Sequence, residues 1–238
     1  MTASTIATPY HAPVAQLDRV SASEAEGREF ESRRAHHERR VQTMRPYDKE
    51  TILTERLLLR PLRETDALEL FSIHSDPRVM RYWSTPPWES IEAAHENIAR
   101  DLKAMAAGEY VQFGIERRED ARLAGKCTLF NLAPKCKRAE IGYGLSSTHW
   151  GRGYAHEALS ALVRFGFQEL DLNRIEADVD PRNLRSLKLL ERLGFTKEGQ
   201  LRERWIVGGE VSDSAIFGLL RRDFVERSKR TPSCACNP

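Results

Sequence analysis

The chain has 238 residues, of which 40% are hydrophobic and 30% charged, and its formal net charge is +2. This near-balance of charge gives no general reason to expect DNA or a membrane surface as a partner. No apolar stretch approaches the roughly 18 residues of a membrane-spanning helix, and the N-terminus lacks the apolar core of a signal peptide. We therefore expect a cytoplasmic protein with one ordinary domain and an additional segment.

The cysteines give no sign of a zinc or redox site, because none of them forms a C-x-x-C pair. They are Cys127, Cys136, Cys234 and Cys236, the last two in a polar tail. We expect buried or incidental thiols in a reducing compartment.

Residues 1–45 show no sustained apolar periodicity, which predicts a disordered leader before a domain at 46–226 and a flexible tail at 227–238. Six arginines and three glutamates lie between Arg28 and Arg45, so a basic arm that touches RNA, for example on a ribosome, is the alternative. Residues 14–37 also resemble peptides produced when transfer-RNA genes are translated, in which case translation would start at Met44. Peptides from residues 1–43 in mass spectra of the natural protein would contradict that last explanation.

The first predicted elements are one strand and two helices. Residues 57–62 read as a strand that ends at a proline. Thr65 or Asp66 can cap the next helix, which extends to about residue 75. Ser90 opens a longer helix that stops near Gly108. The expected inward positions are Leu68, Leu70 and Phe71 in the first helix, and Ile91, Ala94, Ile98, Leu102 and Met105 in the second.

The second half of the chain predicts a sheet with interspersed helices. Strand-like runs at 110–117, 123–130 and 139–145 are separated by short turns, which favours an antiparallel meander. A helix (155–170), a strand (174–180), a helix that Gly194 ends (183–194) and two further strands (195–200 and 212–220) follow. This order predicts an α+β fold with a mixed sheet and helices on its faces.

The turn "WGRGYA", from Trp150 to Ala155, connects a predicted strand to a predicted helix. A helix N-terminus leaves backbone N–H groups unpaired and carries about half a positive charge, so it attracts anions. Gly151 and Gly153 allow a ligand to approach the backbone, and Arg152 adds a cation. The turn matches neither the G-x-G-x-x-G dinucleotide fingerprint nor the P-loop. By itself it predicts a phosphate site, or a tight turn without a ligand.

Four motifs in order, "AEIGYGL", "WGRGYAHEAL", "NRIEADVDPRN" and "SLKLLERLGF", resemble the GNAT superfamily of N-acetyltransferases, and most closely its RimJ/RimL-type branch. The resemblance covers about residues 51–224. It implies a mostly antiparallel sheet flanked by helices on both faces, and acetyl-CoA as a co-substrate without a permanently bound cofactor or metal. The coenzyme A pyrophosphate would bind the backbone amides of Trp150, Gly151, Arg152, Gly153, Tyr154 and Ala155. Trp150 replaces the polar residue that the wider superfamily has there, as is usual in this branch.

Acetyl transfer needs a base for the amine, a donor for the oxyanion and a proton for the departing thiolate. Glu140, in the strand before the glycine turn, is the candidate base, and an ordered water is the alternative. Many GNAT enzymes use a tyrosine as the acid, but Leu190 occupies that place. Ser186 is therefore the candidate acid, by its resemblance to the serine that lies near the CoA sulfur in RimJ/RimL-type enzymes. No acyl-enzyme arrangement is evident, which favours direct attack in a ternary complex.

The remaining predicted contacts involve the co-substrate and the acceptor. Asn183 would bind the pantetheine arm, cap its helix, or do both. A backbone amide at Tyr143 or Leu145 would polarise the thioester carbonyl. Trp83 and Trp88 lie in the segment that borders the acceptor site in related enzymes, and Trp205 with the following turn would form the opposite lip. The acceptor would be a protein N-terminal amine or a small-molecule amine. A catalytically silent acyl-CoA sensor is the alternative function, and the protein would be a monomer or a homodimer.

Overall fold

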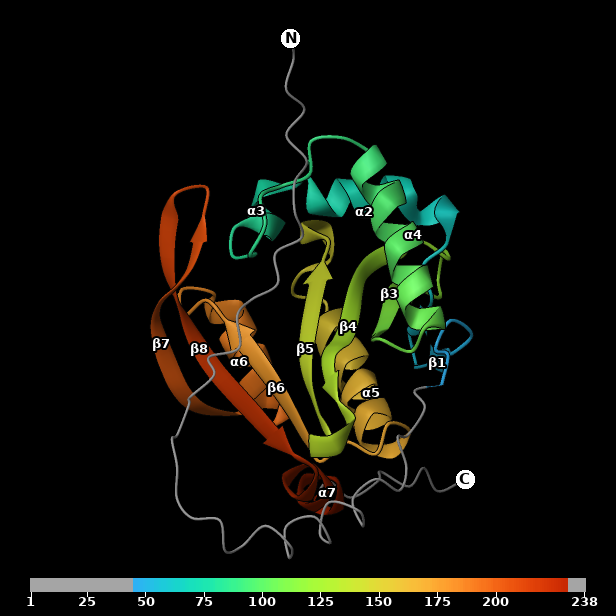
Figure 1. Ribbon diagram of the computed structural model, residues 1–238. Coiled ribbons are helices and arrows are strands. Elements are labelled where there is room, and N and C mark those ends of the chain that lie inside the picture. Colours follow the sequence, from blue (N-terminus) through green and yellow to red (C-terminus); the bar gives the residue numbers. More distant parts are fainter. Residues whose placement is uncertain (1–44, 231–238) are drawn as a thin grey trace, which may run out of the picture. The chain divides into compact units, whose positions relative to one another are not determined.

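A computed structural model describes residues 45–230 of the chain, and the side chains of residues 45–225. The predicted leader, apart from Arg45, and the last eight residues of the predicted tail lie outside this range. An eight-stranded sheet organises the described part, with the strand order β1-β2-β3-β4-β5-β6-β8-β7 (Figure 1). Its strands are β1 (Ile52–Leu53), β2 (Leu57–Arg60), β3 (Val111–Arg117), β4 (Leu123–Ala133), β5 (Arg138–Leu145), β6 (Arg174–Val179), β7 (Thr196–Val207) and β8 (Glu210–Leu220).

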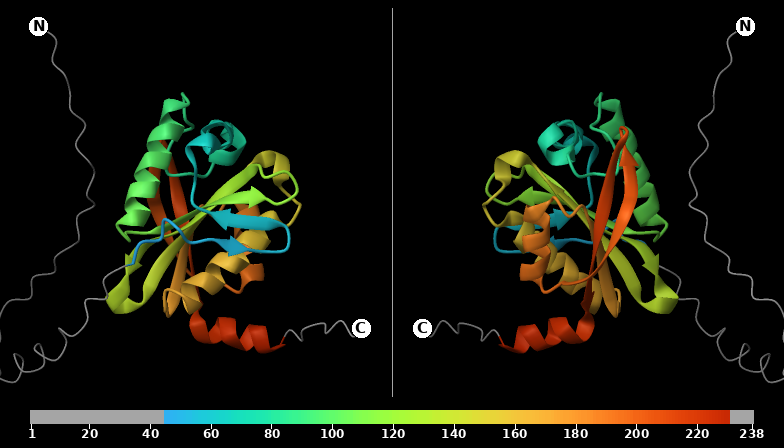
Figure 2. Two further views of the ribbon diagram at one scale, coloured as in Figure 1. Left: turned by 90° about the vertical axis from the view of Figure 1, so that its right-hand side faces the viewer. Right: turned by 90° about the vertical axis from the view of Figure 1, so that its left-hand side faces the viewer.

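Helices cover both faces of the sheet, and Figure 2 shows α4 on one face and α5 on the other. The helices are α2 (Ala67–His74), α3 (Pro77–Met80), α4 (Glu92–Ala106), α5 (Tyr154–Gln168), α6 (Leu184–Leu193) and α7 (Arg221–Arg230). Short 3-10 turns occur at Glu64–Asp66, Pro134–Cys136 and Ser147–His149. The larger core lies between α5, α6 and the sheet, and the smaller core lies under α2 and α4. This architecture confirms the predicted fold class.

The one parallel pair of strands in the described sheet, β5 with β6, is short. Arg138, Ala139 and Glu140 pair with Arg174, Ile175 and Glu176, and there the ladder stops. Beyond this point β6 pairs only with β8, whereas β5 continues to Leu145 along β4. The edge of β5 from Ile141 to Leu145 is therefore not hydrogen-bonded to β6, and the backbone N–H groups on this edge are available to a ligand.

The helix at α2 differs from the prediction. Neither Thr65 nor Asp66 caps it with its side chain. Asp66 instead accepts a hydrogen bond from the Arg63 amide (2.7 Å) and pairs with the buried guanidinium of Arg60. The helix starts at Ala67. In the resulting rotation of the helix, Leu68 faces solvent and is 64% exposed, while Leu70 is buried. The inward placement of Leu68 was wrong.

The other differences lie at element ends. The strand predicted at 195–200 extends to Val207, and α7 continues to Arg230, past the expected domain end. Ala158, Leu159, Leu162 and Phe165 of α5 are buried, and Gly194 ends α6 in the left-handed conformation. Cys127 is buried and Cys136 is exposed. Among the helices of the described part, none is long and apolar enough to cross a membrane.

Candidate active site

The glycine turn adopts the left-handed backbone conformation twice. Gly151 has φ +77° and Gly153 has φ +82°, values that residues with a Cβ rarely adopt. Gly153 immediately precedes α5, a helix of 15 residues. Within the described part, the amides from Gly151 to Ala155 donate to no backbone carbonyl, so the turn presents free N–H groups at a positive helix end. These features fit a pyrophosphate ligand, and we refer to residues 150–155 as the phosphate turn.

Trp150 links this turn to the neighbouring elements. Its indole Nε1 donates to the carbonyl of Leu145 at 3.0 Å, which ties the turn to the end of β5. The Arg185 guanidinium lies 4.7 Å from the centre of the Trp150 ring, which adds a cation–π contact from the first turn of α6. Trp150 therefore packs against Arg185 and holds the glycine turn against the end of β5. Arg185 is a basic neighbour of this turn that sequence reasoning missed.

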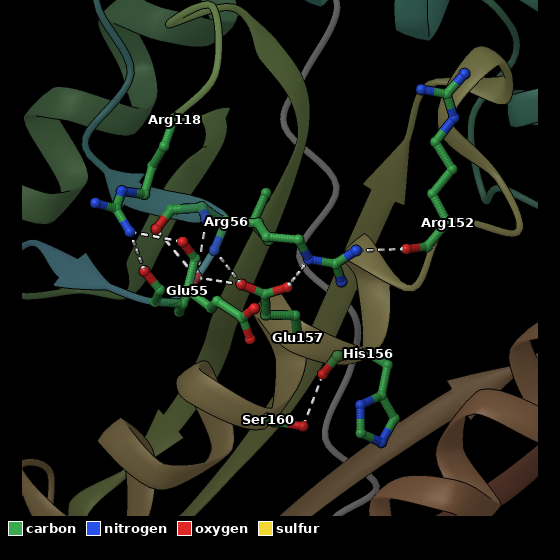
Figure 3. Close-up of polar contacts among 9 residues, drawn as sticks. Glu55, Arg56, Arg118, Arg152, His156, Glu157 and Ser160 are labelled. Carbon is green, nitrogen blue, oxygen red and sulfur yellow. Dashed lines mark hydrogen bonds and ion pairs between the residues drawn. The ribbon is translucent and has the colours of Figure 1, made fainter. Parts of the chain in front are cut away.

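Glu157 fixes the start of α5 to the turn between β1 and β2 (Figure 3). Its carboxylate accepts hydrogen bonds from Thr54 Oγ1 (2.7 Å), the Arg56 amide (2.8 Å) and Arg56 Nε (2.7 Å). Burial alone would raise the pKa of Glu157, but these donors lower it overall. Arg56 Nη1 also donates to the carbonyl of Arg152 at 2.9 Å. Sequence reasoning missed Arg56, whose partners lie about a hundred residues away in the chain.

The Arg152 side chain is available to a ligand. Figure 3 shows its guanidinium directed away from Arg56 and Glu157, and the residue is exposed. None of the described carboxylates forms an ion pair with it. Arg152 can therefore contribute a positive charge at the phosphate turn, beside the free amides.

Tyr143 and Ser186 meet between β5 and α6. Their hydroxyl groups are hydrogen-bonded to each other, and either can be the donor. Burial raises the pKa of Tyr143 to about 12, so its phenol stays protonated near neutral pH. Asn183 caps α6 by accepting a hydrogen bond from the Ser186 amide at 3.2 Å. Ser186 thus lies beside the part of β5 that has separated from β6.

Glu140 lies on the opposite face of β5 from Tyr143, since successive side chains of a strand alternate. It accepts a hydrogen bond from Asn131 Nδ2 at 3.1 Å and lies 3.9 Å from Arg138. It does not contact Ser186, so the two catalytic candidates face different sides of the strand. A hollow of about 460 Å³ adjoins Glu140. Its lining includes Arg138, Glu140, Glu176, Asp178, Glu198 and Arg204.

The acceptor candidates Trp83 and Trp88 lie on this second face, around His74. The His74 ring stacks on Trp88 with centroids 4.3 Å apart, and it meets Trp83 edge-on at 5.0 Å. Trp83 also touches β5, because a Cβ built on Gly144 would lie 2.8 Å from Trp83 Cζ2. Trp205 belongs to β7, where its Nε1 donates to Ser214 Oγ at 3.0 Å. The turn after it, at Gly208 and Gly209, has positive φ at both residues, as tight hairpins require.

Comparisons with known proteins agree with this geometry. A family model described as an acetyltransferase (GNAT) domain matches residues 56–196. The chain is 39% identical over 175 residues to the uncharacterized N-acetyltransferase p20 of Bacillus licheniformis, covering 74% of this chain and 98% of that protein. It is 25% identical over 179 residues to spermidine N(1)-acetyltransferase of Vibrio cholerae, covering 74% of this chain and 100% of that protein. The solved structure of Mycobacterium smegmatis RimJ in complex with CoA-disulfide superposes with a TM-score of 0.69 at 25% identity, covering 75% of this chain and 91% of that one.

Proposed function

Since the chain belongs to the GNAT family of acetyltransferases and uses acetyl-CoA as its co-substrate, we propose that it acetylates a primary amine as a member of the RimJ/RimL-type branch. The likeness to Mycobacterium smegmatis RimJ supports the branch. The observation that carries the site assignment is the opening between β5 and β6, with the phosphate turn at one end and Ser186 beside it.

In the proposed reaction the amine attacks the thioester carbonyl directly. The C–N bond forms, the C–S bond breaks, and coenzyme A leaves as a thiolate. The free amides on the open edge of β5, at Tyr143 or Leu145, would stabilise the oxyanion. The pyrophosphate would lie against the amides of Trp150 to Ala155, with the pantetheine arm near Asn183.

Two proton transfers complete the reaction. The proton lost by the amine would pass to Glu140, on the face with the open hollow, or to an ordered water. Ser186 would give a proton to the thiolate. The hydrogen bond between Tyr143 and Ser186 supports this role, because the phenol can return a proton to the serine.

We also propose that the acetyltransferase domain occupies residues 46–226 and acts in the cytoplasm. Acceptors consistent with the relatives are small amines, including polyamines such as the spermidine in the name of the Vibrio cholerae relative, and protein N-terminal amines.

The test presents acetyl-CoA and the purified full chain with a panel of amino acids, polyamines, other small amines and N-terminal peptides, and measures free thiol. We expect thiol release above background with at least one class of acceptor. Binding of coenzyme A without release for any acceptor would contradict turnover and favour a silent acyl-CoA sensor.

A further inference from the structure

A buried lysine lies next to the proposed acceptor site and has no counter-ion there. Lys126 is on β4, 8% exposed, and its Nζ donates to Asn97 Oδ1 at 3.1 Å. An ammonium group has three N–H donors. The ring of Trp88 lies 5.8 Å from the charge. Within the part that the structure describes, no carboxylate forms an ion pair with Lys126, so two of its donors lack an acceptor.

The negative charge of Asp101 acts on Lys126, but the two residues form no ion pair, and the Asp101 carboxylate accepts hydrogen bonds from other groups. Tyr110 donates its hydroxyl to Asp101 Oδ1 at 2.6 Å, and the Gln112 amide donates to Oδ2. Burial therefore dominates the electrostatics of Lys126 and lowers its pKa to about 8. A buried cation without a paired anion is unfavourable, and such groups cluster at functional sites.

His74 adds a second unsatisfied group beside the first. It is 2% exposed, and its Nε2 has no hydrogen-bond partner among the described residues. Burial and the positive charge of Lys126 lower the pKa of His74 to about 3, so the ring is neutral. A neutral imidazole with the proton on Nε2 is a hydrogen-bond donor. In this tautomer His74 would present a second donor beside the Trp88 ring.

The backbone of Lys126 lies beside the proposed thioester site. Lys126 pairs with Gly144 in the β4–β5 ladder, and paired strands are about 4.8 Å apart. Gly144 lies between Tyr143 and Leu145, whose amides are the candidates for the oxyanion. Gly142 and Gly144 carry no side chain on this face, but Thr128 and Phe130 lie over Gly142 and Trp83 lies over Gly144. An acceptor that displaces Trp83 from Gly144 would place its amine near the thioester and its other end toward Lys126 and His74.

We propose that the acceptor is an amine that also carries a carboxylate, as an amino acid does, and that Lys126 and His74 bind this carboxylate under Trp83 and Trp88. This inference rests on the proposed function and narrows its substrate class. The carboxylate supplies the missing counter-ion and accepts from both unsatisfied donors. A polyamine would instead bring a second cation toward Lys126, and a peptide N-terminus would bring only a neutral carbonyl.

The experiment compares each L-amino acid with its own primary amide as acceptor, because the pair shares the amine and the side chain. The amide has the less basic amine, so a preference for the acid cannot come from a larger fraction of free amine. With the full wild-type chain, we expect at least one amino acid to be acetylated with a kcat/KM at least about tenfold above that of its amide.

Variants of Lys126 and His74 test whether these two residues cause the preference for the amino acid over its amide. Lys126→Met keeps the length of the side chain without its charge, and His74→Phe keeps the stacking without the ring nitrogens. Each should raise the KM for the amino acid about tenfold or more. The KM for acetyl-CoA and the rate with the amide should stay unchanged. Lys103→Met, on the exposed side of α4, is the matched control and should behave as wild type.

Two results separate this inference from the function on which it rests. Equal rates with acid and amide, a polyamine or peptide as the best acceptor, or an unchanged KM in folded Lys126→Met contradict the carboxylate site alone. Absence of turnover with every amine, with coenzyme A still bound, contradicts both the proposed function and this inference. Thermal unfolding of each variant shows whether it is folded.

Discussion

The hydroxyl groups of Tyr143 and Ser186 bring a strand and a helix together at the open edge of β5. Because Tyr143 keeps its proton, the pair can act as a short relay toward a leaving thiolate. We therefore propose that the side chain of Tyr143 takes part in the reaction, whereas the sequence suggested only its backbone amide.

The two hydroxyl groups should have unequal effects on turnover. Ser186→Ala removes the proton donor, and we predict a fall in kcat of about 100-fold, the usual scale of acid catalysis. Tyr143→Phe removes one hydrogen bond, so about tenfold is expected, or ~1.4 kcal/mol. Steady-state kinetics and calorimetric binding of coenzyme A provide the measurement.

The control is Ser160→Ala, which loses a serine hydroxyl on α5 that is bonded only to the carbonyl of His156. It should retain the kcat of the wild type. If Ser186→Ala turned over normally, or weakened coenzyme A binding as much as it slowed turnover, Ser186 would not be the acid.

Residues that depend on one helix could be predicted, and those that depend on distant partners could not. Asn183 and Ser186 are one turn apart, so their shared orientation follows from helical geometry. Arg56 interacts with residues about a hundred positions away, and His74 with Trp83 and Trp88 across a break in the helix. No local pattern signals these contacts.

At the scale of elements, α5 is held by its first turn. The Glu157 carboxylate accepts three hydrogen bonds, and the same Arg56 holds the Arg152 carbonyl in the phosphate turn. The position of the helix N-terminus and the shape of the anion site therefore depend on one set of contacts, between Glu157, Thr54 and the partly exposed Arg56.

Glu157→Gln should weaken both the anchoring of the α5 N-terminus and the binding of coenzyme A at the phosphate turn. We predict a loss of about 1–2 kcal/mol in the free energy of unfolding at pH 7 and a several-fold rise in the Kd for coenzyme A. Because the folded pKa of Glu157 is lowered from 4.5, its stabilisation is present above pH 4.5 and is lost as the pH falls through the folded value. The stability gap between variant and wild type should then close in acid.

Chemical denaturation at several pH values measures this gap. Glu191→Gln, an exposed glutamate of α6, is the matched control and should change neither stability nor affinity. A gap that stays constant down to pH 2 would show that the charge of Glu157 does not carry the effect.

The bounds of regular amphipathic helices could be predicted from the sequence, and the bounds of an exposed strand could not. The bounds of α5 and α6 agree with the prediction within one or two residues, because apolar periodicity and Gly194 mark them. The strand β7 is exposed along nearly its whole length, so no alternation of burial marks its end. At α2, the Arg60–Asp66 ion pair overrides the capping preference of Asp66.

At the scale of the molecule, the sheet is continuous on one side of β5 and opens on the other. The order of elements and four motifs predicted the mixed sheet and its helices. The opening depends on where the β5–β6 ladder stops, three residue pairs from its start, which hydrophobic patterning does not encode. That opening places the phosphate turn, Tyr143 and Ser186 along one line of approach.

The measurement that tests this account most directly is the Kd for coenzyme A when Gly153 is replaced. Gly153→Val forces a β-branched residue into the left-handed region at φ +82°, at a cost of about 1–2 kcal/mol or more, and its Cβ would approach Arg56 at 3.2 Å. We predict a Kd at least about tenfold higher than that of the wild type. Gly208→Val introduces the same kind of strain at the tip of the β7–β8 hairpin and should leave the Kd unchanged. An unchanged Kd in folded Gly153→Val would contradict the assignment of this turn to the coenzyme A pyrophosphate.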